Sequence, residues 1–91
     1  MSSRITVTKD LQQKVLGHID ENRELLAETC LELGNTFAPV GHEQAAADAV
    51  SSWYSRHNMP SFQQNIMPER SNVVARLPGS GSGRSLIFNA H

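Results

Sequence analysis

The stretch that decides the fold is SNVVARLPGSGSGRSLIFNAH, residues 71–91. It contains two apolar runs, 72–77 and 85–90, and each predicts a β-strand because it is short, apolar and bounded by turn-forming residues. The segment between them, Pro78–Gly83, contains three glycines and predicts a flexible turn. So short a link predicts that the two strands pair as an antiparallel hairpin. The run Leu86-Ile87-Phe88 is typical of a strand buried on both faces between two neighbours, so the predicted sheet is incomplete.

The residues before this stretch predict helices. Apolar side chains recur at near-helical spacing over 8–33, and the polar run 20–23 favours a division into two helices. Thr8 is the expected N-cap. The order of elements predicts an α/β chain with helices followed by a β-strand and then the β-hairpin. The predicted elements before the hairpin are a loose arm over 1–7, helices at about 8–19, 21–33 and 42–57, and a half-exposed strand over 62–67.

Length and composition limit the classes of function. Ninety-one residues allow one domain, and a net charge of −1 with 5% aromatic residues gives no general attraction to nucleic acid. The sequence has no apolar run of about 18 residues, so we expect no membrane span and no membrane partner. Polar residues between Asp10 and Lys14 interrupt the apolar core that a signal peptide needs. The single cysteine, Cys30, cannot form an internal disulfide, and we expect a cytoplasmic protein.

Few residues are candidates for a site. Cys30 lies on the predicted apolar face of the first helical region and is expected to be a buried structural thiol. His18, His42 and His57 have no histidine or cysteine at i+3 or i+4 that would complete a metal pair on one helix face. His91 differs because it ends an apolar strand, and ligands in α/β sheets gather at the carboxyl ends of strands. Its position alone makes His91 a candidate metal ligand, and we assign no catalytic or other cofactor-binding residue.

Three segments resemble, in this order, the N-terminal part of the M20 family of metallopeptidases, which includes acetylornithine deacetylase, succinyl-diaminopimelate desuccinylase and carboxypeptidase-like enzymes. The first segment is Gly41-His42-Glu43, followed by the alanine-rich helix. The second is Ser71-Asn72-Val73-Val74-Ala75-Arg76-Leu77-Pro78-Gly79, similar to the family's strand before its glycine-rich turn. The third is Ser85-Leu86-Ile87-Phe88-Asn89-Ala90-His91, similar to the strand that ends in the family's His-x-Asp motif. The resemblance implies that residues 8–91 are the N-terminal segment of an incomplete zinc-peptidase-like catalytic domain.

The resemblance implies a dizinc hydrolase that cleaves amide or peptide bonds of acyl-amino acids or small peptides. His91 takes the position of the motif's histidine, which ligates one of two zinc ions, and the bridging aspartate would lie two positions later. Cobalt or manganese could replace zinc in such sites. In the complete site the two ions activate a water, and a glutamate further along the chain takes its proton. The resemblance assigns no metal-binding role to His42 or Glu43. Glu43 is expected to cap its helix or to position a loop.

One histidine supplies one ligand of the three or more that a zinc site needs. The isolated chain is therefore expected to be inactive and to bind no metal tightly. The resemblance also implies a homodimer formed through a domain outside these residues. The alternative is a non-enzymatic chain, either a gene remnant or a small interaction module that uses the exposed edge of its sheet.

Overall fold

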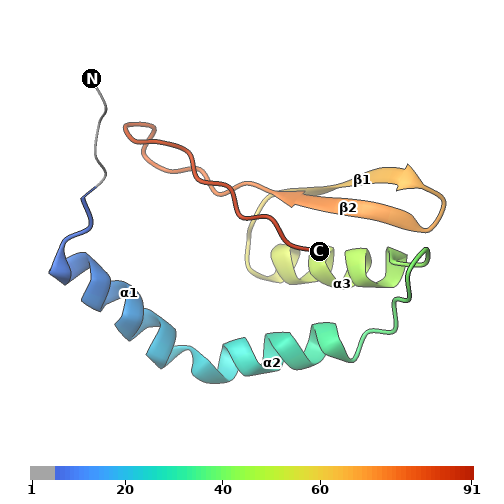
Figure 1. The fold of residues 1–91 in the computed structure, drawn as a ribbon, viewed down its shortest axis with the longest axis horizontal. Coiled ribbons are helices and arrows are strands. Elements are labelled where there is room, and N and C mark those ends of the chain that lie inside the picture. Colours follow the sequence, from blue (N-terminus) through green and yellow to red (C-terminus); the bar gives the residue numbers. More distant parts are fainter. Residues whose placement is uncertain (1–5) are drawn as a thin grey trace. The chain divides into compact units, whose positions relative to one another are not determined.

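The structure is a computed structural model that describes residues 6–91 (Figure 1). The chain is α/β, as predicted, and divides into two compact units, Met1–Asn35 and Thr36–His91. Of the predicted arm over 1–7, residues 1–5 lie outside the described part, and residues 6–8 belong to no helix or strand. The elements are, in chain order, α1 (Lys9–Glu21), α2 (Arg23–Gly34), α3 (Gln44–Arg56), β1 (Ser61–Met67) and β2 (Arg70–Ala75). None of the helices described within residues 6–91 combines the length and apolar character needed to cross a bilayer.

The first unit consists of α1 and α2, and both predicted helices are confirmed. Thr8 caps α1 as expected, because its hydroxyl accepts a hydrogen bond from the Leu11 N–H at 3.2 Å. The break falls at Asn22, inside the polar run that predicted it. The Asn22 side-chain amide donates to the His18 carbonyl at 2.8 Å, a local bond that satisfies one of the free carbonyls at the end of α1.

The apolar face of the first unit is open. No residue of α1 or α2 is buried, and Leu11, Val15 and Ile19 are each about half exposed. The expectation that Cys30 is a buried thiol is wrong, because the structure places it at the surface. The near-helical spacing does put Cys30 on the apolar stripe, but nothing among the described residues of its own unit packs against that stripe.

The second unit consists of α3 and the hairpin formed by β1 and β2, with the helix against the hairpin (Figure 1). The predicted helix over 42–57 is confirmed, and the chain leaves it through Asn58, whose φ is 56°. β1 and β2 are antiparallel and joined by Pro68 and Glu69. Proline followed by a residue of positive φ, here 61° at Glu69, is the pattern of a type II turn.

The predicted hairpin between 72–77 and 85–90 is wrong. β2 pairs with β1, and the two-residue link Pro68-Glu69 favours this pairing because its closure costs little entropy. Among the described residues no strand pairs with the other edge of β2. The predicted strand 85–90 is also wrong in this structure, where residues 84–91 form no helix or strand. Its three large side chains are 76% (Leu86), 86% (Ile87) and 90% (Phe88) exposed. A strand that is apolar on both faces needs neighbours, and the described residues supply none beside this segment.

The two faces of the hairpin differ in an unexpected way. Gln63 and Ser71 lie on the face that contacts α3, since both make hydrogen bonds to that helix. Phe62 and Val74, which are partners in the register, lie on the opposite face and remain exposed. The interface between α3 and the hairpin therefore contains polar contacts beside the partly buried Val73, and Ala47 is the one buried hydrophobic residue in the described part of the chain.

Candidate functional site

His91, the predicted metal ligand, lies at the end of the extended segment that follows β2. It is exposed, and the rigid strand that was expected to support it is not formed. Across residues 6–91, no three histidine, cysteine, aspartate or glutamate side chains lie close enough together to hold a metal ion. The described residues therefore do not by themselves make a zinc site.

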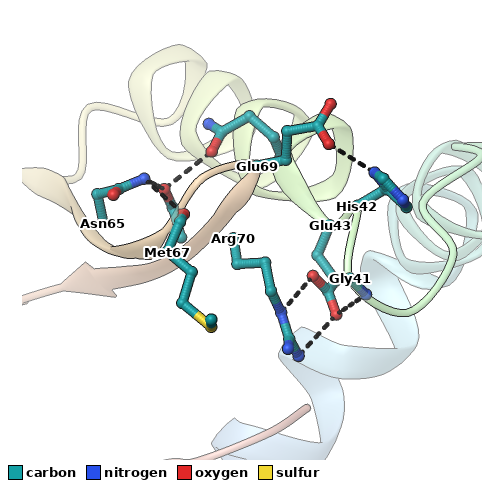
Figure 2. Close-up of polar contacts among 9 residues, drawn as sticks. Gly41, His42, Glu43, Asn65, Met67, Glu69 and Arg70 are labelled. Atoms are coloured by element: carbon teal, nitrogen blue, oxygen red, sulfur yellow. Dashed lines mark hydrogen bonds and ion pairs between the residues drawn. The ribbon is translucent and has the colours of Figure 1, made fainter.

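The structure does gather charged side chains elsewhere, where the loop before α3 meets the turn of the hairpin (Figure 2). We call His42, Glu43, Glu69 and Arg70 the loop–turn cluster. Glu43 Oε2 lies 3.0 Å from Arg70 Nε, and Glu43 Oε1 accepts a bond from Arg70 Nη2 at 3.1 Å, so the pairing is bidentate. His42 Nδ1 lies 2.6 Å from Glu69 Oε2. Two side-by-side pairs thus tie residues 42–43 to residues 69–70.

Backbone conformation explains why these side chains meet. Gly41 has a φ of 89°, in the region that favours glycine, and its N–H donates to Glu43 Oε1 at 2.9 Å. Glu69 occupies the positive-φ position of the hairpin turn, which aims its side chain toward His42 (Figure 2). Nearby, the Asn65 side-chain amide donates hydrogen bonds to the Met67 carbonyl and to the Ser71 hydroxyl. These bonds hold the end of β1 that contains the register irregularity.

The pKa of Glu43 is lowered from its ordinary value. The largest cause is the hydrogen bond from the Gly41 backbone N–H, and the Arg70 guanidinium acts in the same direction, while partial desolvation opposes both. Glu43 was expected to cap its helix or to position a loop. Its side chain makes no capping bond to α3, so the loop-positioning role is the one that the structure supports.

A second polar cluster joins α3 to the hairpin. We call Gln44, Asp48, Ser51, Gln63 and Ser71 the helix–hairpin network. The side-chain amide of Gln63 accepts from the Gln44 amide at 2.8 Å and donates to Asp48 at 2.9 Å and to Ser51 at 3.0 Å. The Ser71 hydroxyl donates to Oε1 of the Gln44 side chain at 2.8 Å. These bonds fix the rotation of α3 against the hairpin.

Asp48 is the charged member of the helix–hairpin network. Its Oδ1 accepts from the amides of both Gln63 and Gln44, each at 2.9 Å. Two donors stabilise the ionised carboxylate, so the pKa of Asp48 is lowered, with the bond from Gln63 as the largest cause.

The Glu43 and Asp48 carboxylates position segments of the chain. The Glu43 carboxylate is engaged by Arg70 and by the Gly41 N–H, and the Asp48 carboxylate by two amides, so a lowered pKa makes each of them a poor general base. Ser51 and Ser71 bond to glutamine side chains and, among the described residues, to no histidine, which an activated nucleophile would require.

The two remaining histidines lie in helical positions, as the sequence indicated. His18 is in the last turn of α1, where its carbonyl accepts from Asn22. His57 ends α3, and its ring stacks on Trp53 with the centroids 3.8 Å apart and the planes 15° from parallel. The His57 Nδ1 also lies 2.7 Å from the Trp53 carbonyl oxygen. Both are exposed.

Sequence reasoning missed most of the polar residues that the structure brings together. Arg70 and Glu69 lie 27 positions from their partners, and nothing local in the sequence signals the pairing. Gln63 gave a weak signal, because it alternates with Phe62 along the strand that was predicted to be half exposed. No protein-family model matches the chain, and no solved structure matches its fold. The M20 resemblance therefore rests on the quoted segments.

Proposed function

We propose that residues 8–91 form the N-terminal part of a metal-dependent hydrolase of the M20 type, which cleaves amide or peptide bonds of acyl-amino acids or small peptides. The observation that supports the proposal is the order of the three segments, which end in Asn89-Ala90-His91. In the structure the loop containing Gly41-His42-Glu43 is held by hydrogen bonds at the start of α3, and an antiparallel hairpin follows the helix. The three helices followed by a sheet agree with an α/β catalytic domain.

In this proposal His91 supplies one metal ligand through a neutral imidazole nitrogen. The other ligands come from outside residues 6–91, because the described residues hold no group that could complete the site. Zinc is the proposed metal, with cobalt or manganese as substitutes. When bound, such ions polarise the scissile carbonyl and activate a water for attack.

The test uses the protein as the source cell makes it. An antibody against residues 8–33 suits the purification, because α1 and α2 have no buried residue. The purified product is weighed intact, its zinc is measured, and its hydrolysis of N-acetyl-amino acids is followed. We expect a product much heavier than 10.0 kDa that contains zinc and loses activity on chelation, with recovery when zinc returns.

A matched pair of variants in that product tests the role of His91. His91→Ala should lose bound zinc and activity together. His57→Ala changes an exposed histidine that has no proposed metal role, and it should keep both. A zinc-free product of about 10.0 kDa, or a His91→Ala variant with full zinc and activity, contradicts the proposal.

A second candidate function is a small interaction module that binds through the hairpin edge. The observation that favours it is the exposure of the apolar residues Leu86, Ile87 and Phe88 beside a two-stranded sheet with unpaired edges. A zinc-free, 10.0 kDa product that is recovered in a stable complex would favour this function over hydrolysis.

A further inference from the structure

We propose that His42 is a nucleophilic modification site, at which the imidazole Nε2 takes an acyl group from an activated ester or anhydride. In this site Glu69 is the positioning residue, because it acts through the imidazole and does not itself touch the acyl donor. The inference uses two side chains of the loop–turn cluster and no metal ion, so it does not rest on the proposed function.

The contact between His42 and Glu69 determines which nitrogen of the imidazole is free (Figure 2). His42 Nδ1 lies 2.6 Å from Glu69 Oε2. An ionised carboxylate can only accept a hydrogen bond, so in the neutral ring the proton lies on Nδ1 and the lone pair on Nε2. The His42 side chain is 63% exposed in the described part of the chain, which leaves Nε2 accessible to a reagent.

A carboxylate at Nδ1 makes Nε2 a better nucleophile. When Nε2 attacks an acyl carbon, positive charge develops on the imidazole, and the Glu69 carboxylate stabilises that charge. The bond between Nε2 and the acyl carbon forms, and the bond from that carbon to the leaving group breaks with its electron pair on the leaving group. The Nδ1 proton is then lost to solvent, and a neutral acyl-imidazole remains.

The surrounding structure holds the pair in this geometry. Glu69 has a φ of 61°, which is uncommon for a residue other than glycine, and residues in such conformations are concentrated at functional sites. On the other side of the pair, Gly41 precedes His42 with a φ of 89°. Arg70 donates from Nε and Nη2 to Glu43, so these two donors do not compete with His42 for the Glu69 carboxylate.

His57 provides a comparison within the same chain, because its ring has the same neutral tautomer without a carboxylate. Its Nδ1 lies 2.7 Å from the Trp53 carbonyl oxygen, which also only accepts a hydrogen bond. A neutral carbonyl stabilises a positive imidazole less than a carboxylate does. The stacked Trp53 ring also covers one face of His57. We therefore expect His42 to react faster than His57, although both side chains are exposed.

The test uses the product purified from the source cell, whatever its length, and diethyl pyrocarbonate as the acyl donor. Mass spectrometry of the digested protein gives the modification rate of each histidine at about pH 8, where ordinary imidazoles are neutral. In the native protein we expect His42 to react about fivefold faster than His57 and His18. In denaturant the three histidines should react at equal rates, because the contact with Glu69 is lost.

A matched pair of variants tests the role of Glu69. Glu69→Gln keeps the length of the side chain and an oxygen that accepts from Nδ1, but it removes the charge. Nitrogen NMR should therefore still show an unprotonated Nε2 in His42, while the modification rate of His42 should fall to that of His57. Glu24→Gln removes the same charge from α2 and should leave the rate at His42 unchanged.

Each measurement can overturn the proposal. A native rate at His42 no higher than that at His57 contradicts the activated nucleophile. So does a proton on Nε2 in the neutral ring of the unmodified protein. A full rate in Glu69→Gln, or equal slowing by the two variants, contradicts the role assigned to the Glu69 carboxylate.

Discussion

Replacing Ala47 by glycine measures how firmly α3 is held against the hairpin. Ala47 is 5% exposed and is the one buried hydrophobic residue in the described part of the chain. Glycine costs about 1 kcal/mol in helix propensity, and the loss of a buried methyl group costs about 0.8 kcal/mol more. We therefore expect Ala47→Gly to lower the free energy of unfolding of the second unit by about 2 kcal/mol.

The control is Ala45→Gly in the same helix. Ala45 is exposed, so its replacement costs at most the propensity term of about 1 kcal/mol. Thermal unfolding followed by helix ellipticity measures both, and a difference of about 1 kcal/mol corresponds to a shift in the midpoint of about 4–8 °C. Equal midpoints for the two variants would refute the reasoning, because they would mean that Ala47 is not packed against the hairpin in solution.

Three further predictions concern titration and reactivity. The pKa values of Glu43 and Asp48 are lowered in the folded state. The two carboxylates therefore contribute their full stability above the ordinary carboxylate range, and this contribution is lost as the pH falls through the lowered pKa values. Thermal midpoints that do not fall on acidification contradict this prediction. Gln63→Ala should raise the pKa of Asp48 toward its ordinary value in a carbon-detected NMR titration, whereas Gln64→Ala, on the opposite face of β1, should leave it unchanged. Cys30 should react with a disulfide reagent as fast in the native protein as in denaturant, and strong protection would show that another segment covers it.

The helices could be predicted from the sequence because their signals are local. The hydroxyl of Thr8 caps the first helix, and the polar run over 20–23 contains the break at Asn22. Alanine-rich composition was enough to identify α3 within two residues at its start. In each case the residues that decide the structure lie within about one turn of the element that they define.

The strand pairing could be predicted only in part, because apolar character does not specify a partner. Residues 72–77 and 85–90 both have strand-forming composition, but of the two only the first contains a strand, β2, which pairs with β1 across the two-residue link Pro68-Glu69. The same limit applies to Cys30. Helical spacing predicts the side of the helix on which Cys30 lies. Whether Cys30 is buried depends on another segment covering that side, and in the structure Cys30 is exposed.

The candidate site was the least predictable part. The Glu43–Arg70 and His42–Glu69 pairs depend on the hairpin turn returning to the loop before α3, which no local pattern encodes. The proposed ligand role of His91 comes from the resemblance, and the described residues place no other ligand beside it.

The scarcity of buried apolar residues in the second unit has a consequence for the heat capacity of unfolding. Exposure of apolar surface raises the heat capacity and exposure of polar surface lowers it, and ordinary domains show a net increase of about 12–15 cal/mol/K per residue. Ala47, at 5% exposed, is the one buried hydrophobic residue among the described residues, and Gln44, Gln63 and Ser71 join α3 to the hairpin through hydrogen bonds. The heat capacity increment of the second unit per residue should therefore be small, so its stability should change little with temperature.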